Sequence, residues 1–238
     1  TDKILFPNDA FGQHIASSQR FDDQIDWGIL KEEAATYYAN IVLPYNSQVQ
    51  KALHALSSLD FDLIAPSHGI IWKNHIKEIL NLYQNWSTNQ TKATAVIIYD
   101  TMWGSTEKLA YALLSGLEEQ GINVRLRNVQ KTPHSQIITD ILEAELICIG
   151  SPTLNNNMLP SIGGFLTYLK GLRPQQRTGF LFGSYGWGGQ AIKLMESMLD
   201  GLSWNFPEKN LNINYIPQEK DLENIKKIGI RLAKNIKE

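Results

Sequence analysis

From about residue 93 onward, the sequence alternates between β-branched apolar runs and segments with helical spacing of apolar residues. The run Ala93–Tyr99 predicts a strand buried on both faces. The segment Ser105–Gln120 predicts a helix that closes at Gly121. The same alternation predicts further strands at 122–127, 145–149, 179–182 and 211–215, and further helices at 135–143, 162–169, 191–199 and 218–236. Five strands that alternate with five helices predict a doubly wound parallel α/β sheet, because parallel neighbours need crossover helices.

The residues before this region have a different pattern. They predict short strands at 4–6 and 63–65 and helices at 27–38, 47–59 and 77–86, too few elements to bury their own apolar faces. A polar, unpatterned stretch follows and predicts a linker. We therefore expect part of one domain at 1–88, a linker at 89–92 and the α/β domain at 93–238.

Composition narrows the class of protein. The 238-residue chain has a formal net charge of −2 and a pI near 6.2, so no basic surface for nucleic acid is expected. No apolar run approaches the roughly 18 residues that span a bilayer. The lone cysteine, Cys148, excludes an internal disulfide and fits a reducing compartment, and its apolar neighbours predict a core position. The cytoplasm is the expected location, without a membrane partner.

Three of the predicted strands are followed by loops rich in glycine, hydroxyl groups and aromatic rings. These loops lie within Tyr99–Thr106, Gly150–Asn156 and Gly183–Gly189. In open α/β sheets, ligands bind beyond the carboxyl ends of the strands, where the strand order reverses. One such loop alone is typical of an ordinary turn, whereas three at one edge favour a ligand site.

The first loop leads into a predicted helix, whose free N–H groups and dipole favour a phosphate. Thr101, Ser105 and Thr106 add hydroxyl groups. No lysine stands where the G-x-x-x-x-G-K-[ST] motif requires one, so a magnesium-bound nucleoside triphosphate is not indicated. The loop therefore predicts a site for the phosphate monoester of a cofactor.

The other two loops supply Asn155, Asn156, Tyr185 and Trp187, which suit a planar ring with a polar rim. The segment Gly186–Ala191 also matches G-x-G-x-x-A, the dinucleotide fingerprint. That fingerprint belongs in the first βα turn, whereas this copy follows the fourth predicted strand and carries a bulky Trp187. NAD binding is therefore not expected here.

The strings T-M-W-G-S-T, S-P-T-L-N-N and S-Y-G-W-G-G closely resemble the cofactor loops of the flavodoxin domain in flavodiiron proteins, also called A-type flavoproteins. The resemblance implies a flavodoxin-like domain that binds FMN, with the phosphate at the first loop and the isoalloxazine ring between the other two. The residues that it assigns to FMN are Thr101, Met102, Trp103, Gly104, Ser105, Thr106, Ser151, Pro152, Thr153, Leu154, Asn155, Asn156, Ser184, Tyr185, Gly186, Trp187, Gly188 and Gly189.

The N-terminal region extends the resemblance. The string N-D-A-F-G-Q-H, which contains Asp9, resembles a segment of the family's metallo-β-lactamase-like αββα domain, in which the aspartate bridges two irons. The string A-P-S-H-G, which contains His68, resembles the segment that supplies a late histidine ligand. Read alone, these are a turn aspartate and a loop histidine. With the resemblance, Asp9 and His68 are candidate ligands of a non-haem diiron site, and His14 is expected nearby without binding metal.

The chain departs from the family in one respect. The H-x-E-x-D-H cluster and a further histidine that precede the Asp9 segment in the family do not occur in this sequence. The chain begins at Thr1, close to a predicted strand, so we expect a fragment or processed product. The remaining iron ligands are expected in a missing N-terminal segment.

The resemblance implies an oxidoreductase that passes electrons from a donor through FMN to the diiron site, where O2 is reduced to water or NO to N2O. A rubredoxin-like protein or a flavin reductase is the expected donor, as a separate protein, and a head-to-tail homodimer is expected. Two alternatives stay open. An electron-transfer flavodoxin without metal chemistry explains 93–238 but leaves Asp9 and His68 unexplained. A hydrolase-type metal domain with a regulatory flavin domain predicts zinc and ester or amide hydrolysis.

Overall fold

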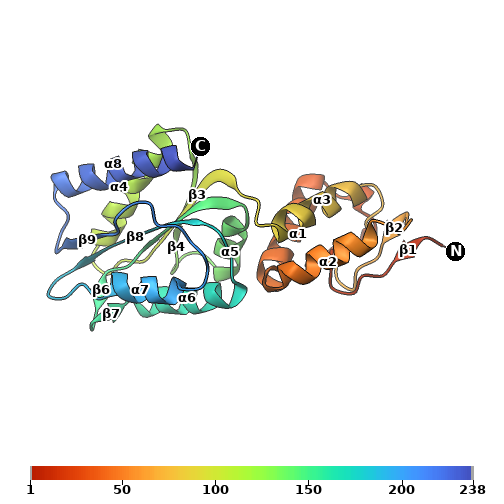
Figure 1. Ribbon diagram of the computed structural model, residues 1–238, viewed down its shortest axis with the longest axis horizontal. Helices are drawn as coiled ribbons and strands as arrows, with labels where there is room; N and C mark the ends of the chain where they lie inside the picture. The colour runs from red at the N-terminus through yellow and green to blue at the C-terminus, as the bar shows by residue number, and fades with distance from the viewer. Residues whose placement is uncertain (1, 237–238) are drawn as a thin grey trace. The chain divides into compact units, whose positions relative to one another are not determined.

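The structure, a computed structural model, describes residues 2–236, which form two compact units divided between Gln90 and Thr91 (Figure 1). The division lies within the polar stretch 89–92. Across the described residues, no helix has both the length and the apolar character that crossing a membrane requires.

The second unit is built on a parallel sheet with the strand order β4-β3-β5-β8-β9. Its strands are β3 (Lys92–Tyr99), β4 (Asn123–Asn128), β5 (Ala144–Gly150), β8 (Thr178–Tyr185) and β9 (Leu211–Asn214). The chain runs from β3 out to β4 and then returns to β5 on the other side, so the strand order reverses between β3 and β5. This is the flavodoxin-like order, and the predicted doubly wound parallel class is confirmed.

Helices cover both faces of this sheet (Figure 1). One face carries α4 (Ser105–Glu119) and α8 (Glu219–Asn235), and the other carries α5 (His134–Leu142), α6 (Pro160–Leu172) and α7 (Ala191–Leu199). The apolar stripes of α4 and α8 pack on the strands in one buried cluster, which includes Cys148. Cys148 is fully buried, which confirms its predicted place in the core, and this burial raises the pKa of its thiol.

The first unit is mainly helical. It contains α1 (Trp27–Tyr37), a π-helical turn (Tyr38–Val42), a 3-10 turn (Leu43–Tyr45), α2 (Asn46–Leu56) and α3 (Ile76–Ser87). Two short strands, β1 (Ile4–Leu5) and β2 (Leu63–Ile64), pair in parallel. A further 3-10 turn spans Asp22–Gln24. The core of this unit is aromatic, with fully buried Tyr37, Tyr38, Trp72, Tyr83 and Trp86.

One element was absent from the sequence-based prediction. Within the loop after β5, β6 (Thr153–Leu154) and β7 (Asn157–Met158) form an antiparallel hairpin. Its two turn residues, Asn155 and Asn156, have φ values of 49° and 58°. Asparagine tolerates this left-handed region, and a two-residue hairpin turn whose twist matches the strands requires it.

Near the start of α3, His75 packs against two residues. Its ring stacks on Trp27 with the centroids 4.7 Å apart, and its Nδ1 lies 3.2 Å from the carboxylate of the fully buried Asp22. Asp22 accepts backbone N–H groups from Lys73, Asn74 and His75, so it fixes the start of α3. His75 is therefore part of the packing of the first unit.

Candidate functional site

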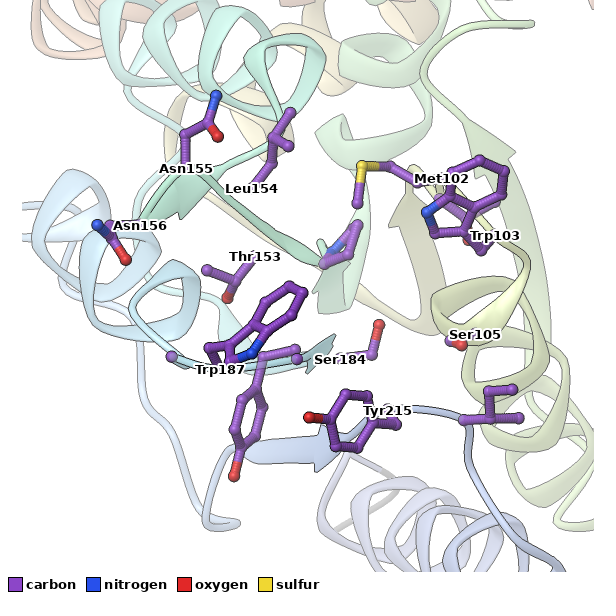
Figure 2. Close-up of a pocket in the computed structure, with 16 residues that line it drawn as sticks. Met102, Trp103, Ser105, Thr153, Leu154, Asn155, Asn156, Ser184, Trp187 and Tyr215 are labelled. Carbon is purple, nitrogen blue, oxygen red and sulfur yellow. The ribbon is translucent and has the colours of Figure 1, made fainter.

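The three loops of the predicted ligand site enclose a cavity of about 800 Å³ at the carboxyl edge of the sheet (Figure 2). It lies beyond β3, β5 and β8, beside the point where the strand order reverses, which is where the topology predicts a ligand. The structure therefore brings together loops that are far apart in sequence. The cavity is lined by Thr101, Met102, Trp103, Ser105, Pro152, Thr153, Leu154, Asn155, Asn156, Ser184, Tyr185, Gly186, Trp187, Gly188, Tyr215 and Ile216.

The first loop presents the N-terminus of α4 to this cavity. Gly104 occupies the N-cap position with a φ of 82°, which glycine adopts without strain, and no side chain caps the helix. The Gly104 N–H donates to Thr101 Oγ1 at 3.0 Å, which closes the loop on itself. The N–H groups of the first turn of α4 have no acceptor within the helix and are available to an anion.

Four of the residues predicted to contact the cofactor, Gly104, Thr106, Ser151 and Gly189, do not line the cavity. Thr106 is fully buried, and its Oγ1 lies 3.2 Å from Ser184 Oγ, so this hydroxyl joins the first loop to the third. Ser151 Oγ accepts the N–H of Leu159 at 3.0 Å and so closes the base of the β6–β7 hairpin. The Thr106 and Ser151 side chains therefore lie behind the lining residues and hold their loops in place.

Large aromatic side chains stand unpacked around the cavity. Trp103 from the first loop is 90% exposed, and Trp187 from the third is 97% exposed. Figure 2 shows these indoles on different sides of the space, with Tyr215 below and to the right of Trp187. Exposed apolar surface gathered at one cavity marks a binding site, and indole faces suit a planar conjugated ring.

Sequence reasoning missed the contribution of β9. Tyr215 and Ile216 follow this strand and line the cavity. The side-chain amides of two asparagines on β9 also brace the third loop: Asn214 Nδ2 donates to Gly186 O at 2.7 Å, and Asn212 Nδ2 donates to Gly189 O at 3.1 Å. A signal was present, because Tyr215 and Ile216 stand at the carboxyl end of the fifth predicted strand, at the same edge as the three loops.

In the first unit, Asp9 and His68 lie together. His68 Nε2 is 3.4 Å from Asp9 Oδ1, and the side chains are 49% and 61% exposed, respectively. Their loops follow the paired strands β1 and β2 and are fastened by backbone bonds from Ser67 N to Asn8 O and from Gln13 N to His68 O. Gln13 is fully buried, and its Oε1 accepts the Ile70 N–H at 2.8 Å. The two candidate ligands are thus held side by side by their backbones.

His14 and Tyr37 lie next to the pair formed by Asp9 and His68. The His14 ring lies 5.8 Å from the His68 ring and 4.8 Å from the Tyr37 ring. Burial, with a smaller contribution from the Asp9 charge, raises the pKa of Tyr37. Among residues 2–236, no group of three or more His, Cys, Asp or Glu side chains gathers closely enough to hold a metal ion. One carboxylate and one imidazole suit iron, but they form only part of a coordination sphere.

Comparison with known proteins agrees with the flavodoxin-like class that the sheet and the cavity define. A family model described as flavodoxin matches residues 97–229. A nitric oxide reductase from Moorella thermoacetica is 43% identical over 238 residues, which cover 99% of this chain and 60% of that protein.

Two solved structures are similar over almost the whole chain. The rubredoxin oxygen:oxidoreductase from Desulfovibrio gigas has a TM-score of 0.96 and 37% identity, over 99% of this chain and 60% of its own. The flavodiiron protein from Giardia intestinalis has a TM-score of 0.95 and 30% identity, over 99% of this chain and 59% of its own.

The chain belongs to the flavodiiron protein family, and its residues 97–229 match the flavodoxin family model. It spans between 48% and 60% of the length of the curated relatives that it matches. A flavodoxin domain implies FMN, and relatives of the flavodiiron type carry a non-haem diiron site. The cavity fits FMN, because it joins an anion-binding helix terminus to unpacked aromatic rings.

Proposed function

We propose that this chain binds FMN in the cavity of the second unit and supplies part of a diiron site in the first. The complete protein then reduces O2 to water or NO to N2O with electrons from a donor protein. The observation that carries the proposal is the cavity itself. It is bounded by an uncapped helix N-terminus at the first loop and by Trp103 and Trp187, both nearly fully exposed.

Different residues of the cavity bind the phosphate and the ring of FMN. Thr101, Ser105 and the N–H groups at the start of α4 receive the phosphate. The hairpin residues Asn155 and Asn156, with Tyr185 and Trp187, surround the ring and limit its contact with water. FMN, when bound, supplies the electron-transfer chemistry, and the protein supplies binding and orientation.

Asp9 and His68 are proposed as iron ligands, with the remaining ligands supplied by a segment outside this chain. Their 3.4 Å separation lets both side chains reach one metal ion. The names of two similar proteins support NO and O2 as substrates and a rubredoxin-like donor. One is named a nitric oxide reductase, and the other a rubredoxin oxygen:oxidoreductase. A flavin reductase is the alternative donor. The head-to-tail homodimer that the resemblance implies remains part of this proposal.

The first test is flavin uptake by the purified chain. We expect a flavin absorption spectrum or, for the flavin-free protein, saturable quenching of FMN fluorescence at a stoichiometry near one. Riboflavin, which lacks the phosphate, is expected to bind more weakly because it does not use the α4 N-terminus. A folded chain that takes up no FMN in excess would overturn the proposal.

The second test addresses the metal half and uses the complete polypeptide. Asp9→Ala is expected to abolish O2 or NO consumption while FMN content stays at the wild-type level. Asp60→Ala is the matched control, because Asp60 is an exposed carboxylate of the same unit that pairs with Lys3. Unchanged turnover in Asp9→Ala would count against Asp9 as an iron ligand. A complete protein that holds FMN but no iron would favour the electron-carrier alternative.

A further inference from the structure

Asp100 is a buried carboxylate beside the flavin cavity that the assignment of FMN-binding residues did not include. It directly follows β3, stands at the start of the first loop and is only 5% exposed. Its Oδ1 accepts the N–H of Thr101 at 2.7 Å. Its Oδ2 accepts the side-chain amide of Gln130 at 3.0 Å and the hydroxyl of Ser161. Neutral donors from three segments therefore converge on one carboxylate.

This carboxylate has no cationic partner. Across the described part of the chain, no ion pair includes Asp100. Burying a carboxylate costs free energy that its hydrogen bonds must offset, whereas an apolar side chain would fill the same space without that cost. The presence of an acid at this position therefore points to a role beyond filling the core.

The donors indicate what that role is. Thr101 lines the cavity, and its Oγ1 in turn accepts the N–H of Gly104 at the N-cap of α4. Gln130 follows β4, and Ser161 lies in the first turn of α6, so both hold the carboxylate from outside the loop. A continuous set of hydrogen bonds thus runs from these two anchors through Asp100 and Thr101 to the start of α4.

We propose that Asp100 is a positioning residue for phosphate recognition. Its carboxylate fixes Thr101, and through Thr101 it fixes the path of residues 101–105 toward the α4 N-terminus. This inference rests on the proposed binding of FMN. The charge of Asp100 opposes a bound phosphate, so the benefit of the residue is geometric. A side chain that keeps the acceptor and loses the charge must therefore serve as well.

The test compares Asp100→Ala and Asp100→Asn in the purified chain, each titrated with FMN and with riboflavin. Asp100→Ala leaves the Thr101 N–H without its acceptor, so the FMN dissociation constant is expected to rise about 10- to 100-fold. The riboflavin constant is expected to change by less than about threefold, because riboflavin has no phosphate to misplace.

Asp100→Asn is expected to bind FMN within about threefold of the wild type. The new amide keeps an oxygen for the Thr101 N–H. Its NH2 group can donate to Ser161 Oγ once that hydroxyl has rotated, and to Gln130 Oε1 once that amide has flipped. Rescue by asparagine separates the loss of hydrogen-bond geometry from the loss of charge.

Two further variants complete the design. Asp140→Asn is the matched control, because Asp140 is a nearly buried carboxylate that pairs with Arg127 and does not line the cavity; its FMN-to-riboflavin affinity ratio should equal that of the wild type. Ser161→Ala removes one anchor and should weaken FMN binding less than Asp100→Ala but in the same direction, which keeps the test available if the alanine variant does not fold.

The outcomes separate the inference from the function on which it rests. A wild-type chain that binds no FMN overturns the proposed function. If the wild type binds FMN, two results for Asp100→Ala overturn the inference alone. In the first, the variant keeps the wild-type affinity for both FMN and riboflavin; in the second, it loses affinity for both by the same factor. An Asp100→Asn variant as weak as the alanine variant also overturns it.

Discussion

The two candidate sites of this chain differ in how much of each site the chain supplies. The cavity of the second unit is walled by loops that follow β3, β5, β8 and β9 and by the N-terminus of α4. The site of the first unit consists of two donors, Asp9 and His68, 3.4 Å apart. Both sites nevertheless form in the same way, because each gathers loops at the carboxyl ends of parallel strands.

The described residues supply different numbers of parallel strands at the two sites. A sheet with the order β4-β3-β5-β8-β9 aligns several loops at one edge, so their side chains can surround a ligand. The pair β1 and β2 aligns only two loops, and each contributes one candidate ligand. The described residues therefore wall the flavin cavity with their own loops, whereas Asp9 and His68 form only part of a site in a chain that spans between 48% and 60% of the length of its curated relatives.

The largest expected effect tests the rigidity of the flavin cavity. A Cβ added at Gly183 would lie 2.2 Å from the carbonyl oxygen of Ser151, a backbone atom of the neighbouring loop. Gly183→Ala should therefore lower the free energy of unfolding of the second unit by about 2–4 kcal/mol and weaken FMN binding. Urea unfolding measures the loss of stability, and release of the flavin measures the weaker FMN binding.

Gly164→Ala is the matched control for this variant. Gly164 lies within α6, and a Cβ there would meet no atom within 4 Å. Alanine in place of glycine inside a helix should raise the free energy of unfolding by about 0.5–1 kcal/mol. If Gly183→Ala and Gly164→Ala behaved alike, the close approach at Ser151 would not constrain the cavity.

The corresponding test in the first unit uses Gly69, next to His68. Gly69 has a φ of 88°, and a Cβ there would lie 1.9 Å from Gln13 Oε1. Gly69→Ala should cost about 1–3 kcal/mol, because it strains the backbone and displaces the buried glutamine from the Ile70 N–H. FMN affinity should stay unchanged. Hydrogen exchange in each unit, combined with FMN titration, checks this; a loss of FMN binding would contradict the independence of the two sites.

A smaller effect is expected at the rim of the cavity. Trp187 is 97% exposed, so Trp187→Ala should leave the free energy of unfolding nearly unchanged. Loss of ring stacking should raise the FMN dissociation constant about 3- to 10-fold. Tyr111→Ala, which removes an exposed aromatic side chain that does not line the cavity, is the control. An unchanged FMN affinity in Trp187→Ala would argue against stacking by this residue.

The smallest effect concerns the phenol of Tyr99, whose contribution to stability decreases at alkaline pH. Burial and the hydrogen bond to Glu107 raise the pKa of Tyr99 to about 12, from an ordinary value of 10. Between these values the unfolded chain releases the phenol proton and the folded chain keeps it, so the stabilisation is complete below pH 10 and is lost as the pH rises towards 12. Tyr99→Phe should cost about 0.5–1.5 kcal/mol at neutral pH through the lost hydrogen bond. That deficit should shrink above pH 10.

Thermal unfolding across this pH range measures the change. Tyr38 and Tyr83 serve as the comparison in the first unit, because burial raises the pKa of both phenols there as well. Tyr99→Phe should alter the alkaline sensitivity of the second unit alone. A deficit that stayed constant up to pH 12 would contradict the role of Tyr99 in this pH dependence.

Much of the second unit could be predicted because its signals are local. The run Ala93–Tyr99 is too apolar for any position except a strand covered on both faces, and the first unit's helices likewise follow from apolar spacing. The Asn155-Asn156 pair was a missed local signal, because both residues favour the left-handed turn of the hairpin. The direction of the Thr106 side chain could not be predicted from sequence, since it depends on a contact with Ser184 in a distant loop.

The sequence by itself determined the order of strands and helices and the three segments that meet at the flavin cavity, because strand periodicity and turn composition are properties of neighbouring residues. The tertiary structure decided which side chains face the cavity and which stand behind its wall. It also brought Tyr215 to the site and placed Thr101, Gln130 and Ser161 around the carboxylate of Asp100. The physical reason is that these contacts join residues far apart in the chain, and only the packing of the sheet and its loops fixes their directions.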